Sequence, residues 1–296
     1  MKQWLLAFRP KTLTAAVVPI FGATALALYE GHEAGAPPIR YWISGLALFI
    51  SVLIQIGTNL INDAVDFEKG ADTKERIGPV RVTQAGLISS RRVYQMAFFT
   101  FGLALLCGIP LVLVGGWPIV VIGIASLIAG YSYTGGPFPL AYRGLGDLFV
   151  VLFFGIVATS GLFFLLTGAW DLSALLLGTQ IGFHCAVLIA INNLRDMHGD
   201  KLVGKRTLPV RFGASFARYE IAFLLLIPFI LNFYWLWRDA VWAFALGFLI
   251  LPLAFVLIHR VFTTPPSPAY NKYLGQSALV HLVFGLLTSV GLVLCR

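Results

Sequence analysis

Long apolar segments alternate with shorter polar ones along the whole chain. An α-helix needs about 20 mostly apolar residues to cross the hydrocarbon core of a membrane. Nine segments are close to this length, at residues 13–30, 41–62, 93–114, 117–133, 146–167, 172–194, 217–237, 240–259 and 273–294. Because they are spread evenly, we expect a single domain of residues 1–296 with an all-α fold, a polytopic membrane helix bundle of about nine transmembrane helices.

The composition supports a membrane protein. Hydrophobic residues make up 58% of the 296 positions and charged residues only 11%. A soluble domain is nearer half apolar and about a quarter charged. The three cysteines, Cys107, Cys185 and Cys295, lie far apart in apolar segments, so they indicate neither a disulfide framework nor a zinc site.

The basic residues predict the orientation of the chain. If the N-terminus lies inside, all of the 21 Lys and Arg residues fall on inner segments except Arg40, Arg238 and Arg296. The positive-inside rule predicts such an asymmetry. The net charge of +8 therefore indicates orientation in a lipid bilayer, and we see no recognition motif for nucleic acid. We expect a multi-pass protein of the inner membrane with a cytoplasmic N-terminus.

Acidic residues gather in two stretches, both on the predicted inner side. The first, residues 59–75, holds five of the 13 acidic residues, and the second is NNLRDMHGD at 192–200. In a helix, residues four apart share one face. This spacing relates Asn59 to Asp63, Asn62 to Asp66, Asn192 to Asp196, and Asp196 to Asp200. Gly70 is expected to end the first helix, so that Asp72 comes from the following loop.

Carboxylates combined with Asn oxygens are suitable ligands for Mg²⁺. Lys and Arg are interleaved with these acids, and guanidinium groups match phosphate oxygens. The combination predicts a metal-bridged diphosphate. A mixed-charge loop is more often only a solvated face, but two such loops on one side, each at a helix end, favour a site.

The two stretches also resemble each other. A shift of 130 residues aligns Asn62 with Asn192, Asp66 with Asp196, and residues 79–81 with residues 209–211. The matched residues are mostly polar, whereas membrane composition repeats apolar residues by chance. We therefore predict an internal pseudo-repeat with halves at about 1–135 and 136–296.

Four segments carry a resemblance to a known family. They are FRPKTL at 8–13, NDAVDFEKGADTKERIGPVRVTQAGLIS at 62–89, YTGGPFPLAYRGLGDLFV at 133–150 and NNLRDMHGDKLVGKRTLPVRFG at 192–213. The chain resembles the UbiA superfamily of intramembrane prenyltransferases over essentially its whole length. Within it, the chain is most similar to the 1,4-dihydroxy-2-naphthoate polyprenyltransferases of menaquinone synthesis. Asp147 is a departure, because Glu is expected there.

The resemblance implies helices around a central cavity and a Mg²⁺-dependent aromatic polyprenyltransferase. The polyprenyl group would pass from polyprenyl diphosphate to the aromatic acid 1,4-dihydroxy-2-naphthoate, with loss of CO₂ and diphosphate, giving demethylmenaquinone. The implied catalytic and metal-binding residues are Asp63, Asp66, Asp72, Asp196 and Asp200. The implied substrate-binding residues are Asn59, Asn62, Asn192, Arg76, Arg81, Lys205 and Arg206, together with Arg9 and Lys11 for the acceptor carboxylate. Tyr131 and Tyr133 match a segment that faces the cavity, and Tyr131 is the candidate for shielding an allylic cation.

Two alternatives stay open. One is a prenyltransferase of the same superfamily with another acceptor, such as 4-hydroxybenzoate. The other is a membrane transporter, since many spans and an internal repeat also fit that class. A transporter usually places its ionisable residues near the bilayer midplane, whereas here the acids gather at inner helix ends. This distribution favours interfacial chemistry.

Overall fold

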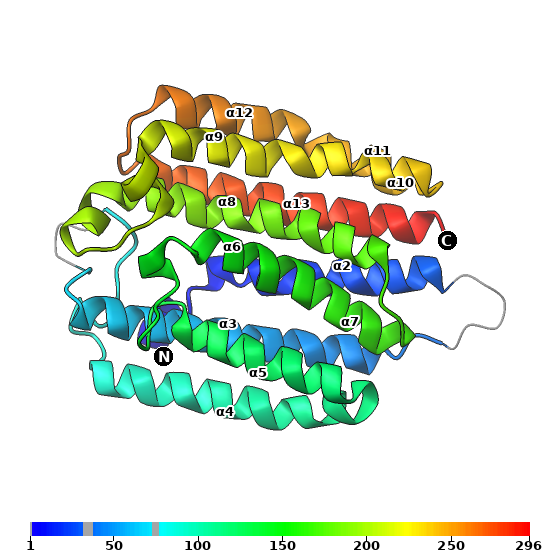
Figure 1. Cartoon of the computed structure of the whole chain (residues 1–296), viewed down its shortest axis with the longest axis horizontal. Helices are drawn as coiled ribbons and strands as arrows, with labels where there is room; N and C mark the ends of the chain where they lie inside the picture. The colour runs from blue at the N-terminus through cyan, green and yellow to red at the C-terminus, as the bar shows by residue number, and fades with distance from the viewer. Residues whose placement is uncertain (1, 32–37, 73–76) are drawn as a thin grey trace.

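The computed structural model describes the chain except for residues 1, 32–37 and 73–76, and its described part consists of helices joined by turns and loops (Figure 1). A short helix, α1 (Lys2–Phe8), and the turn η1 (Pro10–Thr12) precede the bundle. The bundle helices are α2 (Thr14–Glu30), α3 (Tyr41–Glu68), α4 (Ser90–Gly115), α5 (Trp117–Ser132), α6 (Gly146–Val151), α7 (Ala158–Thr167), α8 (Leu172–Leu202), α9 (Leu208–Leu231), α10 (Phe233–Trp237), α11 (Val241–Gly247), α12 (Leu251–Thr263) and α13 (Tyr270–Leu294). Shorter turns are η2 (Ala141–Arg143), the π-helical η3 (Leu152–Val157) and η4 (Phe248–Ile250).

Several of these helices join end to end, and helices lie at the positions of all nine predicted apolar segments. Among the described residues, seven helical segments are long and apolar enough to cross a membrane. The two remaining predicted spans are occupied by shorter apolar helices, α2 and α5. The protein is thus an integral multi-pass membrane protein, although by length and composition alone only seven of the nine predicted spans are established.

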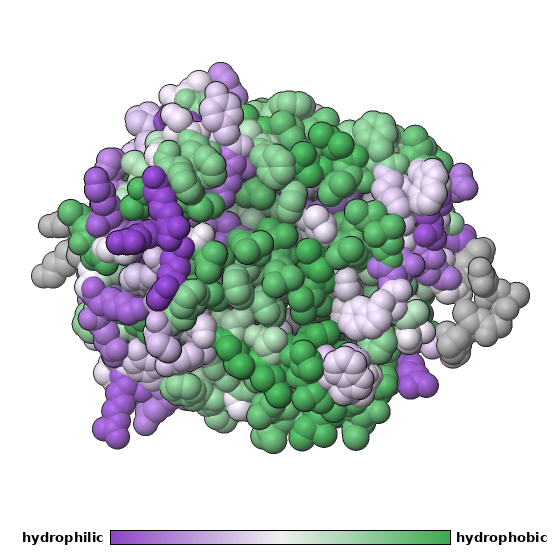
Figure 2. All heavy atoms as spheres, in the orientation of Figure 1, coloured by the Kyte–Doolittle hydropathy of each residue, from purple (hydrophilic) through white to green (hydrophobic). Residues whose placement is uncertain are grey.

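The helices lie side by side along the long axis of the molecule, and α13 packs against α2, α8 and α11 (Figure 1). The face shown in Figure 2 carries a broad hydrophobic belt between two hydrophilic ends. This distribution is expected when the middle of the bundle faces lipid and its ends face water. The C-terminal ends of α3 and α8 lie at the same end of the bundle, together with the loops that follow them (Figure 1).

One close helix contact fixes the position of α8 in the bundle. The π-helical turn η3 packs against α8 at Gly155, Gly178 and Gly182. A Cβ atom at Gly155 would lie 2.3 Å from the carbonyl oxygen of Gly178 and 2.5 Å from the Cα atom of Gly182. Small residues allow helix backbones to approach closely in membranes. The glycines therefore hold α8, which carries the second acidic stretch, directly against α6 and α7.

The first acidic stretch ends as predicted. The helix α3 ends at Glu68, and Gly70 has a positive φ of 69°. The amide nitrogens of Ala71 and Asp72 donate to the carbonyl oxygen of Asp66 at 2.8 and 3.3 Å. The chain therefore turns back at once, and it places Asp72 beside the end of the helix that carries Asp66.

Candidate active site

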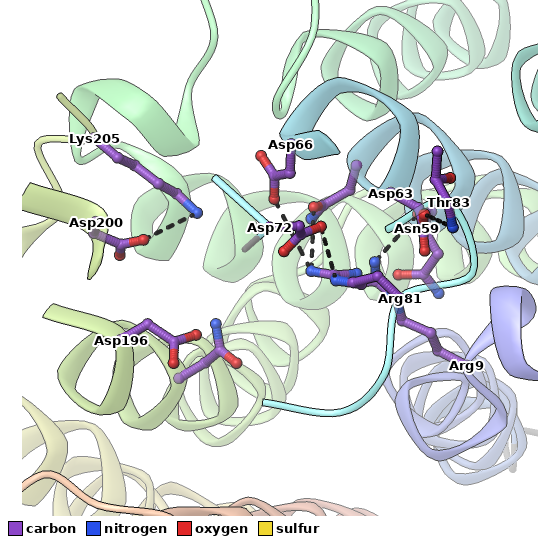
Figure 3. A network of polar contacts seen from close by, with 12 residues as sticks. Arg9, Asn59, Asp63, Asp66, Asp72, Arg81, Thr83, Asp196, Asp200 and Lys205 are labelled. Carbon is purple, nitrogen blue, oxygen red and sulfur yellow. Dashed lines mark hydrogen bonds and ion pairs between the residues drawn. The ribbon is translucent and has the colours of Figure 1, made fainter. Parts of the chain in front are cut away.

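The two acidic stretches meet at the polar end of the bundle. Figure 3 shows Asp66 and Asp72 of the first stretch on one side, and Asp196 and Asp200 of the second on the other. Residues that lie about 130 positions apart in the sequence thus form one polar network.

Arg81 is the centre of the first group. Its Nε atom lies 3.4 Å from Oδ2 of Asp72, and its Nη2 atom lies 4.0 Å from Oδ2 of Asp66. Nη2 also donates to Oδ1 of Asn62 at 3.4 Å. All three charged side chains are buried, with 3 to 8% of their surface exposed. A buried guanidinium between two carboxylates keeps them close together without leaving like charges uncompensated.

Two residues of the first stretch are engaged in placing neighbouring segments. Asp63 accepts hydrogen bonds from the backbone amides of Val82 and Thr83, at 3.3 and 3.0 Å. The Asn59 amide donates to the carbonyl oxygen of Phe8 at 3.2 Å and to the hydroxyl of Thr12 at 3.1 Å. Asp63 therefore fixes the loop that carries Arg81, and Asn59 fixes the segment between α1 and α2.

Arg9 belongs to that segment, between α1 and α2. Its backbone adopts a left-handed conformation with φ of 52°, and its Nη2 atom donates to the carbonyl oxygen of Asn59 at 3.4 Å. Arg9 therefore lies beside α3, and its role toward the acceptor stays a prediction. The side chain of Lys11 lies outside the described residues, as does Arg76.

Arg195 organises the second stretch. It is almost fully buried and binds Asp196 through two hydrogen bonds, Nε to Oδ1 at 2.7 Å and Nη2 to Oδ2 at 2.6 Å. It also donates to Oδ1 of Asn192 and to Oδ1 of Asn271, each at 2.7 Å. Asn271 in turn donates to the carbonyl oxygen of Ile77 at 3.0 Å. This chain of bonds links α8, the start of α13 and the loop after the first stretch.

Asp200 and Lys205 form the other part of the second group. Lys205 Nζ lies 3.7 Å from Oδ1 of Asp200, and the backbone amide of Lys205 donates to the Asp200 carbonyl oxygen at 2.9 Å. The turn between them uses Gly204, whose φ is 72°. Arg206 follows with an exposed side chain at the edge of the site.

Tyr142 is a site residue that the sequence did not indicate. Its hydroxyl donates to Oδ1 of Asp66 at 2.9 Å, although the two residues are 76 positions apart. Burial, and then the Asp66 carboxylate, raise the pKa of this hydroxyl well above its usual range. Asp200 and Asp72 act in the same direction, so Tyr142 lies in the field of carboxylates from both stretches and remains a donor.

Tyr131 lies at the surface of the described structure, and its role beside an allylic cation stays a prediction. Its side chain is 36% exposed, packs on the exposed ring of Phe98 at 6.1 Å between centroids, and does not line the cavity. Tyr133 does line the cavity. Tyr131 and Tyr133 are two positions apart, and in a helix such side chains point roughly 200° away from each other, so the two rings face different sides. A Cβ atom at Gly146 would lie 3.1 Å from the Tyr133 hydroxyl oxygen, so this ring lies beside the start of α6.

A cavity of about 350 Å³ extends from this end into the bundle. Thr58 and Tyr133 line it near the site, and Ala47, Leu111 and Leu165 line it deeper in the membrane. Most other lining residues are apolar and come from α2, α3, α4, α5, α6, η3 and α7. The cavity is therefore a suitable place for a long hydrocarbon chain whose polar head lies at the acidic end.

The carboxylates match the way in which Mg²⁺ usually binds proteins. Among the described residues, no group of three or more acidic, His or Cys side chains forms a ready-made metal site. Mg²⁺ commonly takes one or two carboxylates plus phosphate oxygens and water, so it needs no cage made only of protein. The acids on each side of the site fit such a shared arrangement.

The fold and the site define a class, namely polytopic membrane proteins with a carboxylate-rich site at one interface and an apolar cavity leading from it. Residues 16–285 match the UbiA prenyltransferase family, and the chain belongs to this family. It is 32% identical to the 1,4-dihydroxy-2-naphthoate octaprenyltransferase of Haemophilus influenzae, over 99% of this chain and 96% of the relative. It is 37% identical to the protein of the same name from Escherichia coli, over 76% of this chain and 73% of the relative.

Solved structures show the same fold. A UbiA homologue from Archaeoglobus fulgidus, in a structure bound to GPP and Mg²⁺, aligns with a TM-score of 0.65 over 97% of this chain and 99% of that chain. The sequence identity is 17%, so this similarity concerns the fold.

Proposed function

We propose that the protein transfers a polyprenyl group from polyprenyl diphosphate to 1,4-dihydroxy-2-naphthoate. Diphosphate and CO₂ are lost, and the product is demethylmenaquinone in its reduced form. One structural observation carries the proposal: carboxylates and bases from both stretches gather at one end of the bundle, and an apolar cavity that Thr58 and Tyr133 line on that side lies within the bundle. A diphosphate suits the first environment and a polyprenyl tail the second. The names of the Haemophilus influenzae and Escherichia coli relatives support the naphthoate as acceptor.

We assign Mg²⁺ binding to Asp66, Asp72, Asp196 and Asp200, because these carboxylates line the two sides of the site. When bound, Mg²⁺ supplies positive charge that stabilises the departing diphosphate. Asp63 accepts two backbone hydrogen bonds, so we assign it to placement of the loop that carries Arg81. The bases Arg81, Lys205, Arg206 and Arg76 are proposed phosphate contacts.

The proposed reaction begins with cleavage of the allylic C–O bond, whose electron pair leaves with the diphosphate. The apolar cavity walls exclude water, which would otherwise quench the allylic cation. Tyr133 lines this cavity, and we propose that its ring faces such a cation. A carbon of the electron-rich naphthoate then attacks the cation. The acceptor carboxylate, for which we propose Arg9 and Lys11 as partners, leaves as CO₂ and its bonding pair stays on the ring.

We further propose that the site faces the cytoplasm from an inner membrane. The distribution of basic residues supports this orientation, since the N-terminus and the loops of the site share the side rich in Lys and Arg.

The test is a prenylation assay with the purified chain, a polyprenyl diphosphate, Mg²⁺ and either 1,4-dihydroxy-2-naphthoate or 4-hydroxybenzoate. We expect prenylated naphthoate with release of CO₂, and no product in EDTA. Asp66→Asn should abolish turnover. The matched control is Glu68→Gln, because Glu68 ends the same helix but bonds Ser90 and Tyr94 outside the site. Prenylation of the benzoate alone would contradict the acceptor, and activity retained in Asp66→Asn would contradict the metal assignment.

A further inference from the structure

We propose that Tyr142 is a positioning residue that joins the two halves of the site, with its hydroxyl orienting Asp66 and its ring holding Lys69 and Lys205 for the diphosphate. The inference rests on the proposed function, since it assigns a role toward the same metal and diphosphate. Tyr142 comes from the connection between α5 and α6, which belongs to neither acidic stretch.

The hydroxyl of Tyr142 acts on the residues of the first acidic stretch. It donates to Oδ1 of Asp66 at 2.9 Å, while Oδ2 of the same carboxylate lies 4.0 Å from Arg81. The two oxygens of Asp66 thus have different partners on opposite sides. A hydrogen bond to one oxygen of a carboxylate fixes the direction in which the group presents its remaining lone pairs. The hydroxyl of Tyr142 therefore sets the orientation of a proposed metal ligand.

The ring of Tyr142 lies close to one ammonium group from each side of the site. Lys69 Nζ lies 4.1 Å from the ring centroid, and Lys205 Nζ lies 5.4 Å from it. Both distances are within the range of about 6 Å over which an aromatic face attracts a cation. Lys69 also donates to the carbonyl oxygen of Thr134 at 3.0 Å, and Lys205 approaches Asp200. One ring thus attracts two positive charges, which offsets part of the repulsion between them.

The backbone holds Tyr142 against the second half. The amide of Arg206 donates to the carbonyl oxygen of Tyr142 at 2.9 Å, and Arg211 Nη2 donates to the carbonyl oxygen of Arg143 at 2.7 Å. The next residue, Gly144, has φ of 70°, and a Cβ atom there would lie 2.6 Å from the Arg206 carbonyl oxygen. The loop therefore packs closely on the segment after α8 and cannot move independently of it.

These contacts give the hydroxyl and the ring separable roles. The hydroxyl reaches a carboxylate and should affect metal affinity. The ring reaches two ammonium groups and should affect diphosphate affinity even without metal. A tyrosine that only filled space would affect neither quantity selectively.

The experiment compares Tyr142→Phe and Tyr142→Leu in the full-length chain in detergent micelles. Mn²⁺ binding is followed by electron paramagnetic resonance, and inorganic diphosphate binding in EDTA by calorimetry. Tyr142→Phe should weaken Mn²⁺ binding by about 10- to 100-fold, as is typical for loss of a partner of a metal ligand. Its diphosphate affinity should stay within about twofold of the original, because the ring is kept. Tyr142→Leu should weaken both, with a loss of about fivefold or more for diphosphate.

Tyr94→Phe is the matched control. Tyr94 donates to Oε2 of Glu68 at 2.9 Å, so this variant also removes a tyrosine–carboxylate bond from α3. It should leave both affinities unchanged. Unchanged Mn²⁺ binding in Tyr142→Phe would overturn the role of the hydroxyl, and unchanged diphosphate binding in folded Tyr142→Leu would overturn that of the ring. If Tyr142→Leu does not fold, Tyr142→Trp, which keeps an aromatic face, should retain diphosphate affinity, and a loss there would overturn the ring's role.

The outcome is distinct from that of the proposed function. Selective effects at Tyr142 in a chain that binds Mn²⁺ and diphosphate but does not prenylate the naphthoate would support the role of Tyr142. The same result would refute the proposed acceptor.

Discussion

Replacing Arg195 by Met should destabilise the protein strongly, because it removes the charge that compensates Asp196. The Arg195 side chain is 0% exposed, while that of Asp196 is 18% exposed. Removing one partner of a buried ion pair typically costs 3–5 kcal/mol, of which much is the penalty for the remaining charge. Water can reach part of Asp196, so we expect the lower end of this range, about 3 kcal/mol.

The assay is equilibrium unfolding in mixed detergent micelles, with the free energy of unfolding measured for a double-mutant cycle. Arg195→Met and Asp196→Asn each leave one member of the pair without its partner. The double variant leaves neither charge, so its loss should be smaller than the sum by about 1–3 kcal/mol. A loss below about 1 kcal/mol for Arg195→Met, or strict additivity in the cycle, would refute the view that this pair holds α8 and its neighbours together.

Three further predictions concern the cavity, the helix contact and the loop. Gly123 lines the cavity and has open space at its Cβ position, so a Phe side chain there would occupy part of the cavity. Gly123→Phe should therefore lower kcat/KM for long polyprenyl donors more than for geranyl diphosphate, whereas Gly102→Phe, at an exposed position, should not. Equal effects on both donors would contradict the assignment of the cavity to the polyprenyl tail. Gly155→Ala should lower the free energy of unfolding by about 1–3 kcal/mol, because the added methyl group overpacks the contact with α8. Gly45→Ala is the control and should have no such effect, since the Cβ position of Gly45 lies in open space. Unchanged thermal stability of Gly155→Ala would exclude a tight contact. Asn271→Ala should speed amide hydrogen exchange in residues 77–88, since it removes the hydrogen bond to the Ile77 carbonyl oxygen. Unaltered exchange in these residues would show that this bond does not restrain the loop.

The positions of the helices could be predicted because span length and hydrophobicity depend on local sequence. Their inner ends could not be placed as well. The predicted spans ended at residues 62 and 194, where polar residues begin, but α3 continues to Glu68 and α8 to Leu202. Hydropathy falls at the first polar residue, whereas the helical hydrogen bonds continue past it. The spacing of four residues between Asn and Asp indicated the ends of these helices better than the fall in hydropathy did.

The roles of individual site residues depended on contacts that are distant in sequence. Asp63 and Asp66 are three residues apart on α3, and their partners distinguish them: the Val82 and Thr83 amides bond Asp63, whereas the Tyr142 hydroxyl bonds Asp66. Tyr142 lies in one of the segments that carry the family resemblance, but its contact with Asp66, 76 positions away, depends on how the folded segments pack together. The pseudo-repeat of the two halves stays a prediction.

The chain of bonds from Arg195 through Asn271 to Ile77 has a consequence for biogenesis. Asn271 lies at the start of α13, the last helix of the bundle, while Ile77 follows the first acidic stretch. During synthesis the early loop is therefore without this restraint until the final span has entered the membrane. The site should mature only when the last helix docks, so that incompletely inserted chains do not hold a finished reaction centre.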